Sequence, residues 1–370
     1  MVSGNRIIIA GGGLAGLIAA IRLNRAGFKC VLVEKKTYPF HRVCGEYISN
    51  ETTEFLRREG LYPESFQPPQ ITTLLLSSVS GKGSVNQLDL GGFGISRFTF
   101  DHYLFEVAKR EGIDVRVGTE IESIRYDNHF TVRIPGETLE SDIVIGAFGK
   151  RSKLDVQLSR KFIKERSPYV GVKYHAKTDH TDNLIALHNF RGGYCGVSNV
   201  ENGKTNICYL THRDQLKKSG SIESLERNIL SENPNLKKLF GHADFLFDKP
   251  EVINEISFET KEPVLNHILM VGDAAGMITP LCGNGMAMAI HSAKILTDIL
   301  INNRNLRQQE REQMYTAAWK KAFSKRLWIG RQIQNKLFGT EWGSTIAVNL
   351  AVHSKFVANS LIKLTHGKPF

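Results

Sequence analysis

Three glycines near the start of the chain have the spacing of a phosphate-binding turn. Gly11, Gly13 and Gly16 follow the G-x-G-x-x-G pattern between an apolar, strand-like run and a helix-prone stretch. Such glycines permit a tight turn, bring backbone N–H groups close to a pyrophosphate and let the helix lie close on the strand. The pattern therefore predicts a dinucleotide site. Its expected phosphate contacts are Gly11, Gly13, Leu14, Ala15 and Gly16.

An acidic residue ends the next apolar run. Val31-Leu32-Val33 is typical of the second strand of the same unit, and Glu34 lies at its tip. The carboxylate can accept hydrogen bonds from a ribose, whereas a free carboxylate there disfavours a 2′-phosphate. Glu34 and the adjacent Lys35 are predicted to lie at the nucleotide. This unit alone does not separate FAD from NAD.

A loop shortly beyond Glu34 resembles that of a known flavoprotein family. A basic residue, Arg42, followed by Val43-Cys44-Gly45-Glu46 is similar to the flavin-contacting loop of the geranylgeranyl reductase branch of the para-hydroxybenzoate hydroxylase-like flavoproteins. In that family the loop lies along the isoalloxazine and ribityl parts of FAD. Cys44 matches a cysteine of many reductase-branch members, and it is interpreted either as a redox residue or as a small buried thiol.

Three later segments resemble the same family. Residues 97–104 resemble its R-x-x-x-D-x-x-L helix start, where the arginine contacts the flavin, and Asp101 is expected to cap this helix or to balance charge. Residues 119–124 match the segment whose backbone holds the adenine, and 142–152 resemble the second nucleotide signature. Phe148 replaces an aspartate of the hydroxylases, which weakens the case for NAD(P)H docking of their kind. The contacts that the resemblance adds are Arg42, Cys44, Gly45, Arg97, Ile121, Ala147 and Gly149.

A second glycine motif lies late in the chain. The apolar strand 268–271 ends in Gly272-Asp273, and a turn over 280–285 leads into a helix. Asp273 can hydrogen-bond the ribityl hydroxyls of FAD, which an NAD-only site does not need, and the helix N-terminus can stabilise an anionic reduced flavin. In the resembling family the two glycine motifs together indicate non-covalent FAD. The contacts expected here are Gly272, Asp273, Pro280, Gly283, Asn284, Gly285 and Met286.

Catalytic residues are harder to assign. Residues 192–200 occupy the position of an aromatic-Pro motif of the reductases but lack its tryptophan and proline. The tryptophan-containing motif of flavin halogenases is missing too, which argues against halogenation. No hydrolytic triad, carboxylate pair or metal-ligand cluster stands out in the sequence, so no metal site is expected. The candidate catalytic or pocket residues are Cys44, His188, Tyr194 and Cys195.

The order of elements predicts an α/β fold. A Rossmann-like FAD-binding domain of the glutathione reductase/PHBH type is expected to carry an inserted antiparallel β-sheet substrate domain and a helical C-terminal extension. Alternating residues at 73–97 and 166–261 indicate the substrate-binding sheet, and 306–370 has helical spacing. The discontinuous FAD-binding domain is assigned to residues 1–72, 98–165 and 262–305.

Charge and cysteine usage restrict partners and compartment. The net charge is +11, and residues 301–370 hold twelve Lys/Arg against three Asp/Glu. This distribution indicates a solvated basic helix surface, or attraction to an acidic carrier protein or an anionic membrane surface; no nucleic-acid-binding motif accompanies it. Five scattered cysteines suggest neither a zinc site nor a disulfide framework. With no apolar run of about 20 residues and no targeting signal, a cytoplasmic location is expected, with peripheral membrane contact left open.

The resemblance implies two enzyme classes. The first is an FAD-dependent reductase or dehydrogenase acting on a carbon–carbon bond of a bulky apolar or carrier-bound substrate, with NAD(P)H as a candidate electron donor. The alternative is an NAD(P)H-dependent flavin monooxygenase that hydroxylates an aromatic or lipid-like substrate. A non-catalytic flavoprotein is disfavoured because the flavin-contacting loops look complete.

Overall fold

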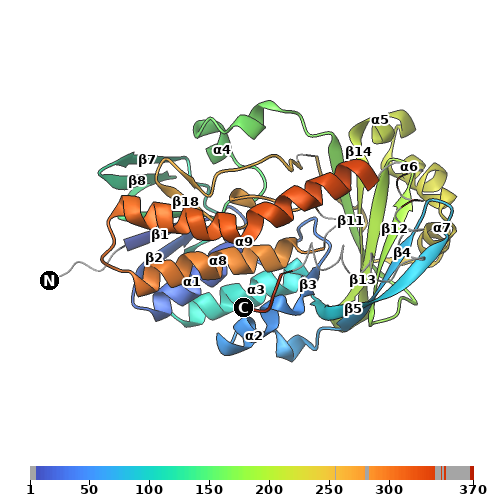
Figure 1. The fold of residues 1–370 in the computed structure, drawn as a ribbon, viewed down its shortest axis with the longest axis horizontal. Helices are drawn as coiled ribbons and strands as arrows, with labels where there is room; N and C mark the ends of the chain where they lie inside the picture. Colours follow the sequence, from blue (N-terminus) through green and yellow to red (C-terminus); the bar gives the residue numbers. More distant parts are fainter. Residues whose placement is uncertain (1–5, 255, 280–282, 338–342, 344–345, 347–366) are drawn as a thin grey trace.

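Two main β-sheets lie toward the two ends of an elongated molecule (Figure 1). The computed structural model describes residues 6–254, 256–279, 283–337, 343, 346 and 367–370. The smaller main sheet contains six strands in the order β17-β18-β10-β1-β2-β6, and all neighbours but β17 and β18 pair in parallel. Its strands are β1 (Arg6–Ala10), β2 (Lys29–Val33), β6 (Asp114–Arg116), β10 (Ile143–Gly146), β17 (Val264–Leu265) and β18 (Ile268–Met270).

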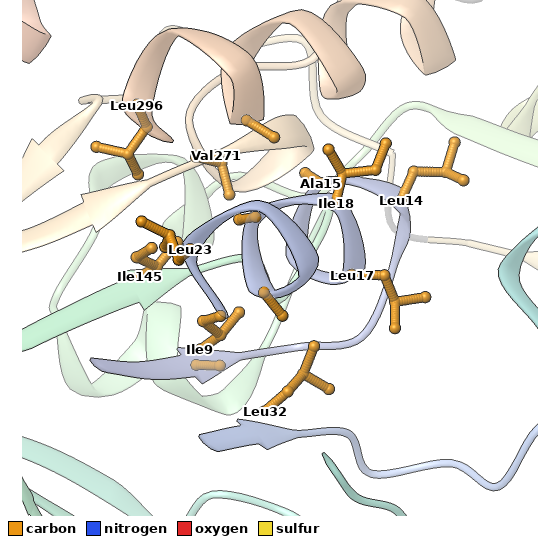
Figure 2. Close-up of a cluster of buried hydrophobic side chains, with 14 of the residues drawn as sticks. Ile9, Leu14, Ala15, Leu17, Ile18, Leu23, Leu32, Ile145, Val271 and Leu296 are labelled. Atoms are coloured by element: carbon orange, nitrogen blue, oxygen red, sulfur yellow. The ribbon is translucent and has the colours of Figure 1, made fainter. Parts of the chain in front are cut away.

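Apolar residues on both faces of β1 place this strand at the centre of the parallel sheet. Ile7, Ile8 and Ile9 are fully buried, as expected for a parallel strand that is covered on both sides. Helix α1 (Leu14–Arg25) connects β1 to β2, and its apolar residues pack between the sheet and α8 (Gly285–Asn302). Figure 2 shows this core, in which Ile9, Ile18 and Leu296 come from β1, α1 and α8.

Further elements cover the parallel sheet. Helix α3 (Arg97–Arg110) packs beside α1, and α9 (Gln308–Leu337) packs on α8. A three-stranded sheet, β7 (Ser123–Asp127), β8 (His129–Ile134) and β9 (Glu137–Ser141), contacts β1 and β10. The short helices α2 and α4 span Thr53–Arg58 and Lys153–Gln157.

The larger sheet has nine strands. Eight follow the order β15-β11-β14-β13-β12-β4-β5-β3, and β16 pairs with β11. Most neighbours are antiparallel, while β4 and β12 pair in parallel. The strands are β3 (Tyr47–Ser49), β4 (Gln70–Ser77), β5 (Gly83–Gly94), β11 (Tyr169–Lys177), β12 (Leu184–Phe190), β13 (Gly193–Val200), β14 (Lys204–His212), β15 (Asp244–Phe245) and β16 (Glu251–Ile253).

Among the described residues, short helices pack on one face of this larger sheet. Buried side chains of β11–β14 form a core with α6 (Ile222–Asn228) and α7 (Pro234–His242), and α5 (Arg213–Ser219) follows β14. The opposite face points toward the parallel sheet. The predicted fold class is confirmed: a Rossmann-like nucleotide-binding unit, an inserted, mostly antiparallel sheet and a C-terminal helix. The domain boundaries stay a prediction; β3 joins the larger sheet although residues 1–72 were assigned to the FAD-binding domain.

Helix α9 is the long C-terminal helix of the described residues. Its helical spacing places Tyr315, Trp319, Phe323 and Leu327 on one buried face. Residues 338–342, 344–345 and 347–366 of the expected helical region 306–370 lie outside the described residues. Across the part of the chain that the structure covers, no helix combines the length and apolar character needed to cross a bilayer.

Candidate flavin-binding site

A cavity of about 730 Å³ separates the two main sheets. The segments that follow β1, β2, β10 and β18 line one side of it, so the carboxyl ends of four strands of the parallel sheet meet there. Open α/β sheets bind their ligands at this edge. The uncovered face of the larger sheet lines the other side, mostly with apolar residues of β12, β13 and β14.

The glycine turn after β1 combines close packing with open space. Gly11 has a φ of 112°, and a side chain there would collide with the carbonyl of Ala147, while one at Gly16 would collide with the carbonyl of Gly11. A Cβ at Gly13, in contrast, would meet only Arg97 Nη2, at 3.4 Å. Gly11 and Gly16 are therefore required by the fold itself, whereas Gly13 leaves space that opens on the cavity.

The N-terminus of α1 is free to receive an anion. Its N-cap, Gly13, offers no side chain to the first N–H groups, and the first turn holds no acidic residue. Unpaired N–H groups and the helix dipole together favour a phosphate at this position. Gly16 does not line the cavity, so its role is the close packing of helix on strand.

The Glu34 carboxylate is hydrogen-bonded to the glycine turn after β1. One carboxylate oxygen accepts the Gly12 N–H at 2.8 Å, and the other accepts the Lys36 N–H at 3.0 Å. Arg42 Nη2 lies 3.4 Å from the first of these oxygens. The carboxylate thus stands beside the phosphate turn and lines the cavity, where a ribose hydroxyl is expected.

Asp101 balances charge but does not cap its helix. Helix α3 is capped by Ser96, whose hydroxyl accepts the Thr99 N–H at 3.1 Å. Asp101 lies in the second turn, where it bonds Arg97 Nε and Nη2, each at 2.7 Å, and Arg42 Nε at 3.1 Å. Burial disfavours the charged guanidinium, but Asp101 outweighs this and raises the pKa of Arg97. Arg97 therefore stands as a fixed cation at the edge of the cavity.

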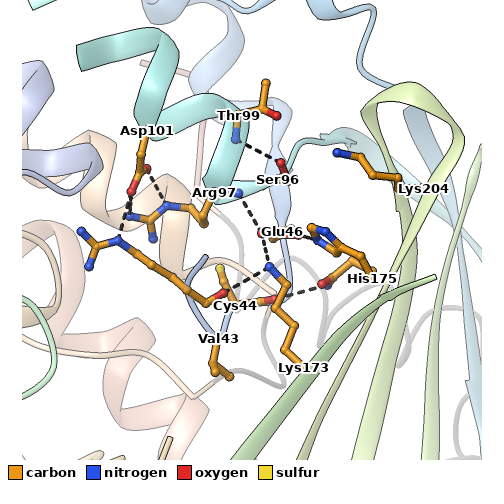
Figure 3. Close-up of polar contacts among 12 residues, drawn as sticks. Val43, Cys44, Glu46, Ser96, Arg97, Thr99, Asp101, Lys173, His175 and Lys204 are labelled. Carbon is orange, nitrogen blue, oxygen red and sulfur yellow. Dashed lines mark hydrogen bonds and ion pairs between the residues drawn. The ribbon is translucent and has the colours of Figure 1, made fainter. Parts of the chain in front are cut away.

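A buried carboxylate ends the loop that resembles the flavin-contacting loop (Figure 3). Glu46 lies at φ 54° and is fully buried. It bonds Lys173 Nζ at 2.5 Å, His175 Nε2 at 2.6 Å and the Arg97 N–H at 2.7 Å. Burial alone would raise the pKa of Glu46, but Lys173 and His175 lower it to about 2. The carboxylate is therefore ionised at neutral pH.

The late glycine motif borders the same cavity. Gly272 has a φ of 60° and donates its N–H to Ser292 Oγ at 2.8 Å, which fixes the turn at the end of β18. Asp273 lines the cavity, and its backbone carbonyl accepts Lys261 Nζ at 2.9 Å. Helix α8 begins at Gly285 with no acidic residue in its first turn. Pro280 lies outside the described residues.

The fold brings most predicted cofactor contacts together although they are far apart in the sequence. Glu46, Lys173 and His175 were not among them, because a salt bridge between a loop and a strand far away in the sequence leaves no local pattern. The predicted residues that line the cavity are Gly11, Gly13, Leu14, Ala15, Glu34, Lys35, Arg42, Cys44, Gly45, Arg97, Ile121, Ala147, Gly149, Gly272, Asp273, Gly283, Asn284, Gly285 and Met286.

Two of the four candidate catalytic residues lie on the wrong face of the larger sheet. Cys44 and Tyr194 line the cavity, whereas His188 and Cys195 do not. Successive side chains of a strand point to opposite faces, so the pairing of His188 with Cys195 sends both away from the cavity. His188 Nδ1 lies 2.8 Å from Ser77 Oγ, and burial lowers its pKa to about 4. Burial raises the pKa of the Cys195 thiol, and neither residue lines the cavity.

The residues at the cavity fit FAD. An uncapped helix N-terminus and the open space at Gly13 suit the pyrophosphate, and Glu34 and Asp273 offer carboxylates for the ribose and ribityl hydroxyls. Within the described residues, the N–H groups of Cys44 and Gly45 donate to no protein acceptor. They remain available to the polar edge of a flavin ring.

Comparison with known proteins identifies the family. The profile of the FAD binding domain family matches residues 5–318, so the chain belongs to this family. Among curated relatives, conditioned medium factor receptor 1 of Dictyostelium discoideum is 22% identical over 355 residues (85% of this chain, 67% of that protein). The flavin-dependent halogenase armH3 of Armillaria mellea is 24% identical over 327 residues (77% and 64%). The digeranylgeranylglycerophospholipid reductase of Methanosarcina acetivorans is 24% identical over 339 residues (85% and 80%).

Solved structures support the same fold. A geranylgeranyl bacteriochlorophyll reductase-like protein from Thermoplasma acidophilum superposes with a TM-score of 0.78 at 18% identity, covering 97% of this chain and 94% of that one. The flavin-dependent halogenase CmlS gives a TM-score of 0.74 at 20% identity, covering 90% and 64%. The chain spans about two thirds of the length of several of these proteins.

The chain is therefore a member of the para-hydroxybenzoate hydroxylase-like flavoproteins. Its cofactor is FAD, and its class is that of FAD-dependent oxidoreductases. The relatives are named as a receptor, reductases, halogenases and monooxygenases, so the family alone leaves the reaction open.

Proposed function

We propose that the protein reduces or dehydrogenates a carbon–carbon bond of a bulky apolar or carrier-bound substrate. The apolar extension of the cavity beyond the predicted flavin contacts carries this proposal. Its walls come from the larger sheet and from the segments before and after β18. The apolar lining residues of this extension are Leu74, Leu88, Ile185, Leu187, Val197, Leu210, Val252, Ile253, Ile256 and Met277.

A wall made of this many apolar side chains suits a hydrocarbon chain better than a small polar substrate. Aliphatic side chains bury apolar substrate surface and keep water from the reacting carbons. When bound, FAD supplies hydride-transfer chemistry. The chain's own part is to hold the substrate in a dry space next to the loop at residues 42–46 and to bring Tyr194, whose hydroxyl donates to Gln334 Oε1 at 3.4 Å, to the wall.

The curated relatives include three digeranylgeranylglycerophospholipid reductases, each matched over about three quarters or more of its length. Their names favour a polyprenyl group as the apolar substrate. Phe148 lines the cavity where hydroxylases carry an aspartate, which gives no support to NAD(P)H docking of the hydroxylase kind. The monooxygenase alternative is an outcome of the test below.

The test uses the FAD-loaded protein reduced with dithionite under anaerobic conditions and mixed with geranylgeraniol. We expect the flavin to reoxidise without O₂ and the alcohol to gain hydrogen across a double bond. The fully saturated alcohol, as the matched control, should not reoxidise the flavin. If reoxidation of the flavin instead requires O₂, and an isotopic label supplied in the O₂ appears in the product, the protein is a monooxygenase. If geranylgeraniol reoxidises the flavin no faster than the saturated alcohol, a polyprenyl substrate is excluded.

We also propose that the exposed face of α9 docks on an anionic membrane surface. Lys320, Lys321 and Lys325 are exposed on this face, and Trp328 is 57% exposed. The sequence from residue 313 to 337 contains no acidic residue. Lysines attract anionic lipid, and tryptophan favours the membrane interface. The opposite face of α9 reaches the cavity wall through Gln334, so docking would bring the apolar end of the cavity close to the lipid.

A further inference from the structure

The loop at residues 42–46 is held by side chains from outside the parallel sheet. Lys173 Nζ donates to the carbonyl oxygen of Arg42 at 3.2 Å, in addition to its contact with Glu46. Asn206 Nδ2 donates to the carbonyl oxygen of Cys44 at 3.2 Å. Lys173 lies on β11 and Asn206 on the neighbouring strand β14, so the larger sheet binds two alternate carbonyls of this loop. Figure 3 shows Lys173 and His175 reaching from the sheet toward Glu46 and the loop.

The direction of these carbonyls fixes the direction of the loop's N–H groups. Because the C=O and N–H of a trans peptide point in opposite directions, the N–H groups of Val43 and Gly45 point away from the strands that bind the carbonyls of Arg42 and Cys44. No described residue accepts a hydrogen bond from the N–H of Val43, Cys44 or Gly45. All three residues line the cavity. The larger sheet therefore orients the N–H groups of Val43 and Gly45, whereas Lys150 Nζ, from the segment after β10, donates to the Val43 carbonyl oxygen at 3.2 Å and so orients the N–H of Cys44.

Glu46 links the loop at residues 42–46 to β11 and to α3. Its carboxylate bonds Lys173 and His175 of β11 and also the N–H of Arg97 at the start of α3. The backbone of Glu46 is in the left-handed region, which a residue with a side chain rarely adopts unless its surroundings hold it there. One buried carboxylate thus ties the end of the loop to the larger sheet and to the helix that presents Arg97.

We propose that Glu46, Lys173, His175 and Asn206 are positioning residues through which the larger sheet sets the affinity and the reduction potential of the flavin. None of these side chains needs to touch the cofactor for this effect. They hold the two peptide planes that carry the N–H groups of Val43 and Gly45, so that these donors are oriented before FAD binds. Donors oriented in advance stabilise charge on a bound group without a reorganisation cost.

The test compares variants of the FAD-reconstituted protein. Asn206→Ala removes the donor to the Cys44 carbonyl and leaves the Glu46 cluster intact, and Lys173→Met removes the cation. The control is Tyr174→Phe, which removes a hydroxyl that donates to Glu226 at 3.0 Å on the opposite face of the same strand. The readouts are the Kd for FAD, the reduction potential against a reference dye, and the melting temperature of the apoprotein.

We expect Lys173→Met to raise the Kd for FAD roughly tenfold or more, because it loses the bonds to both the Arg42 carbonyl and Glu46. Asn206→Ala should raise the Kd by a smaller factor, because it loses only the bond to the Cys44 carbonyl. Both should shift the reduction potential in the same direction. Tyr174→Phe should lower the melting temperature without changing either flavin property. The proposal is overturned if both loop variants lower the melting temperature as the control does but keep the wild-type Kd and potential.

If Lys173→Met misfolds, two other variants still test the proposal. Removing Lys173 leaves the buried Glu46 carboxylate without its ammonium partner, although its bonds to His175 and the Arg97 N–H remain, and this can destabilise the fold. The pair Glu46→Gln/Lys173→Met removes both charges together, and Asn206→Ala changes no charge. Unchanged potentials in these two variants would contradict the proposal, whereas altered potentials at an intact fold would support it.

Discussion

Substitution of Gly13 separates cofactor binding from folding. Its φ of −84° and ψ of −174° are open to any residue, and an added Cβ meets only the end of the Arg97 side chain, at 3.4 Å. Gly13→Val should therefore fold with nearly the stability of the wild-type apoprotein. The valine side chain would, however, occupy the space in front of α1 where the pyrophosphate is expected.

The expected loss follows from the hydrogen bonds at that helix N-terminus. A hydrogen bond to a charged group contributes about 1.5–3 kcal/mol, so the loss of two N–H contacts with phosphate costs roughly 3–6 kcal/mol. Since about 1.4 kcal/mol corresponds to a factor of ten, the Kd for FAD should rise by about two to four orders of magnitude.

The assay is titration of the apoprotein with FAD by calorimetry, with a thermal melt of the same preparation. Gly16→Ala is the matched control, because its methyl group would collide with the carbonyl of Gly11 and should destabilise the apoprotein itself. A Gly13→Val protein that melts like the wild type and binds FAD with an affinity within a factor of about two would refute the placement of the pyrophosphate.

Three further predictions concern other parts of the site. Asp273→Ala should weaken FAD binding by about 1.5–3 kcal/mol in calorimetry, and an unchanged Kd would show that the ribityl hydroxyls are elsewhere. The pKa of Glu46 is lowered from 4.5 to about 2, so its stabilisation is complete above pH 4.5 and is lost as the pH falls toward 2. Between pH 4.5 and 2, the free energy of unfolding in urea should fall by on the order of 3 kcal/mol more in the wild type than in Glu46→Gln. The same pH profile in both proteins would contradict the ionised cluster. The triple variant Lys320→Glu/Lys321→Glu/Lys325→Glu should lower the affinity for phosphatidylglycerol vesicles, measured by co-sedimentation, roughly a hundredfold. Each lysine is taken to contribute about 1 kcal/mol of binding free energy. The equal charge change at Lys217, Lys218 and Lys237, which are exposed on α5 and α7, should not lower this affinity. Equal losses in both variants would show non-specific attraction, and capture by an acidic protein without vesicle binding would favour a carrier.

The nucleotide unit was predictable from sequence because its determinants are local. Apolar strands, glycines at a fixed spacing and an acid at a strand tip lie within about thirty residues of one another. The same is true of the strand that ends in Gly272-Asp273. Local patterns also placed both glycine motifs at strand ends, and the topology of a parallel sheet then brings these ends to one edge.

The Glu46 cluster could not be predicted in this way. Lys173 and His175 alternate with apolar residues on β11, a pattern that is typical of a strand with one solvent-facing side. Both are buried because the loop at residues 42–46 covers that side, more than 120 residues away in sequence. The misplacement of His188 and Cys195 has a related cause. A residue next to a pocket residue in the sequence is easily taken for a pocket residue too. In a strand, however, successive side chains point to opposite faces of the sheet.

A crystal structure of the FAD complex is the most direct test of the central claim that the two glycine motifs bind one extended cofactor. We expect the pyrophosphate at the N-terminus of α1 beside Gly13, the ribityl chain at Asp273 and the flavin ring along residues 42–46. Density for FAD that leaves either Gly13 or Asp273 without contact would contradict this account.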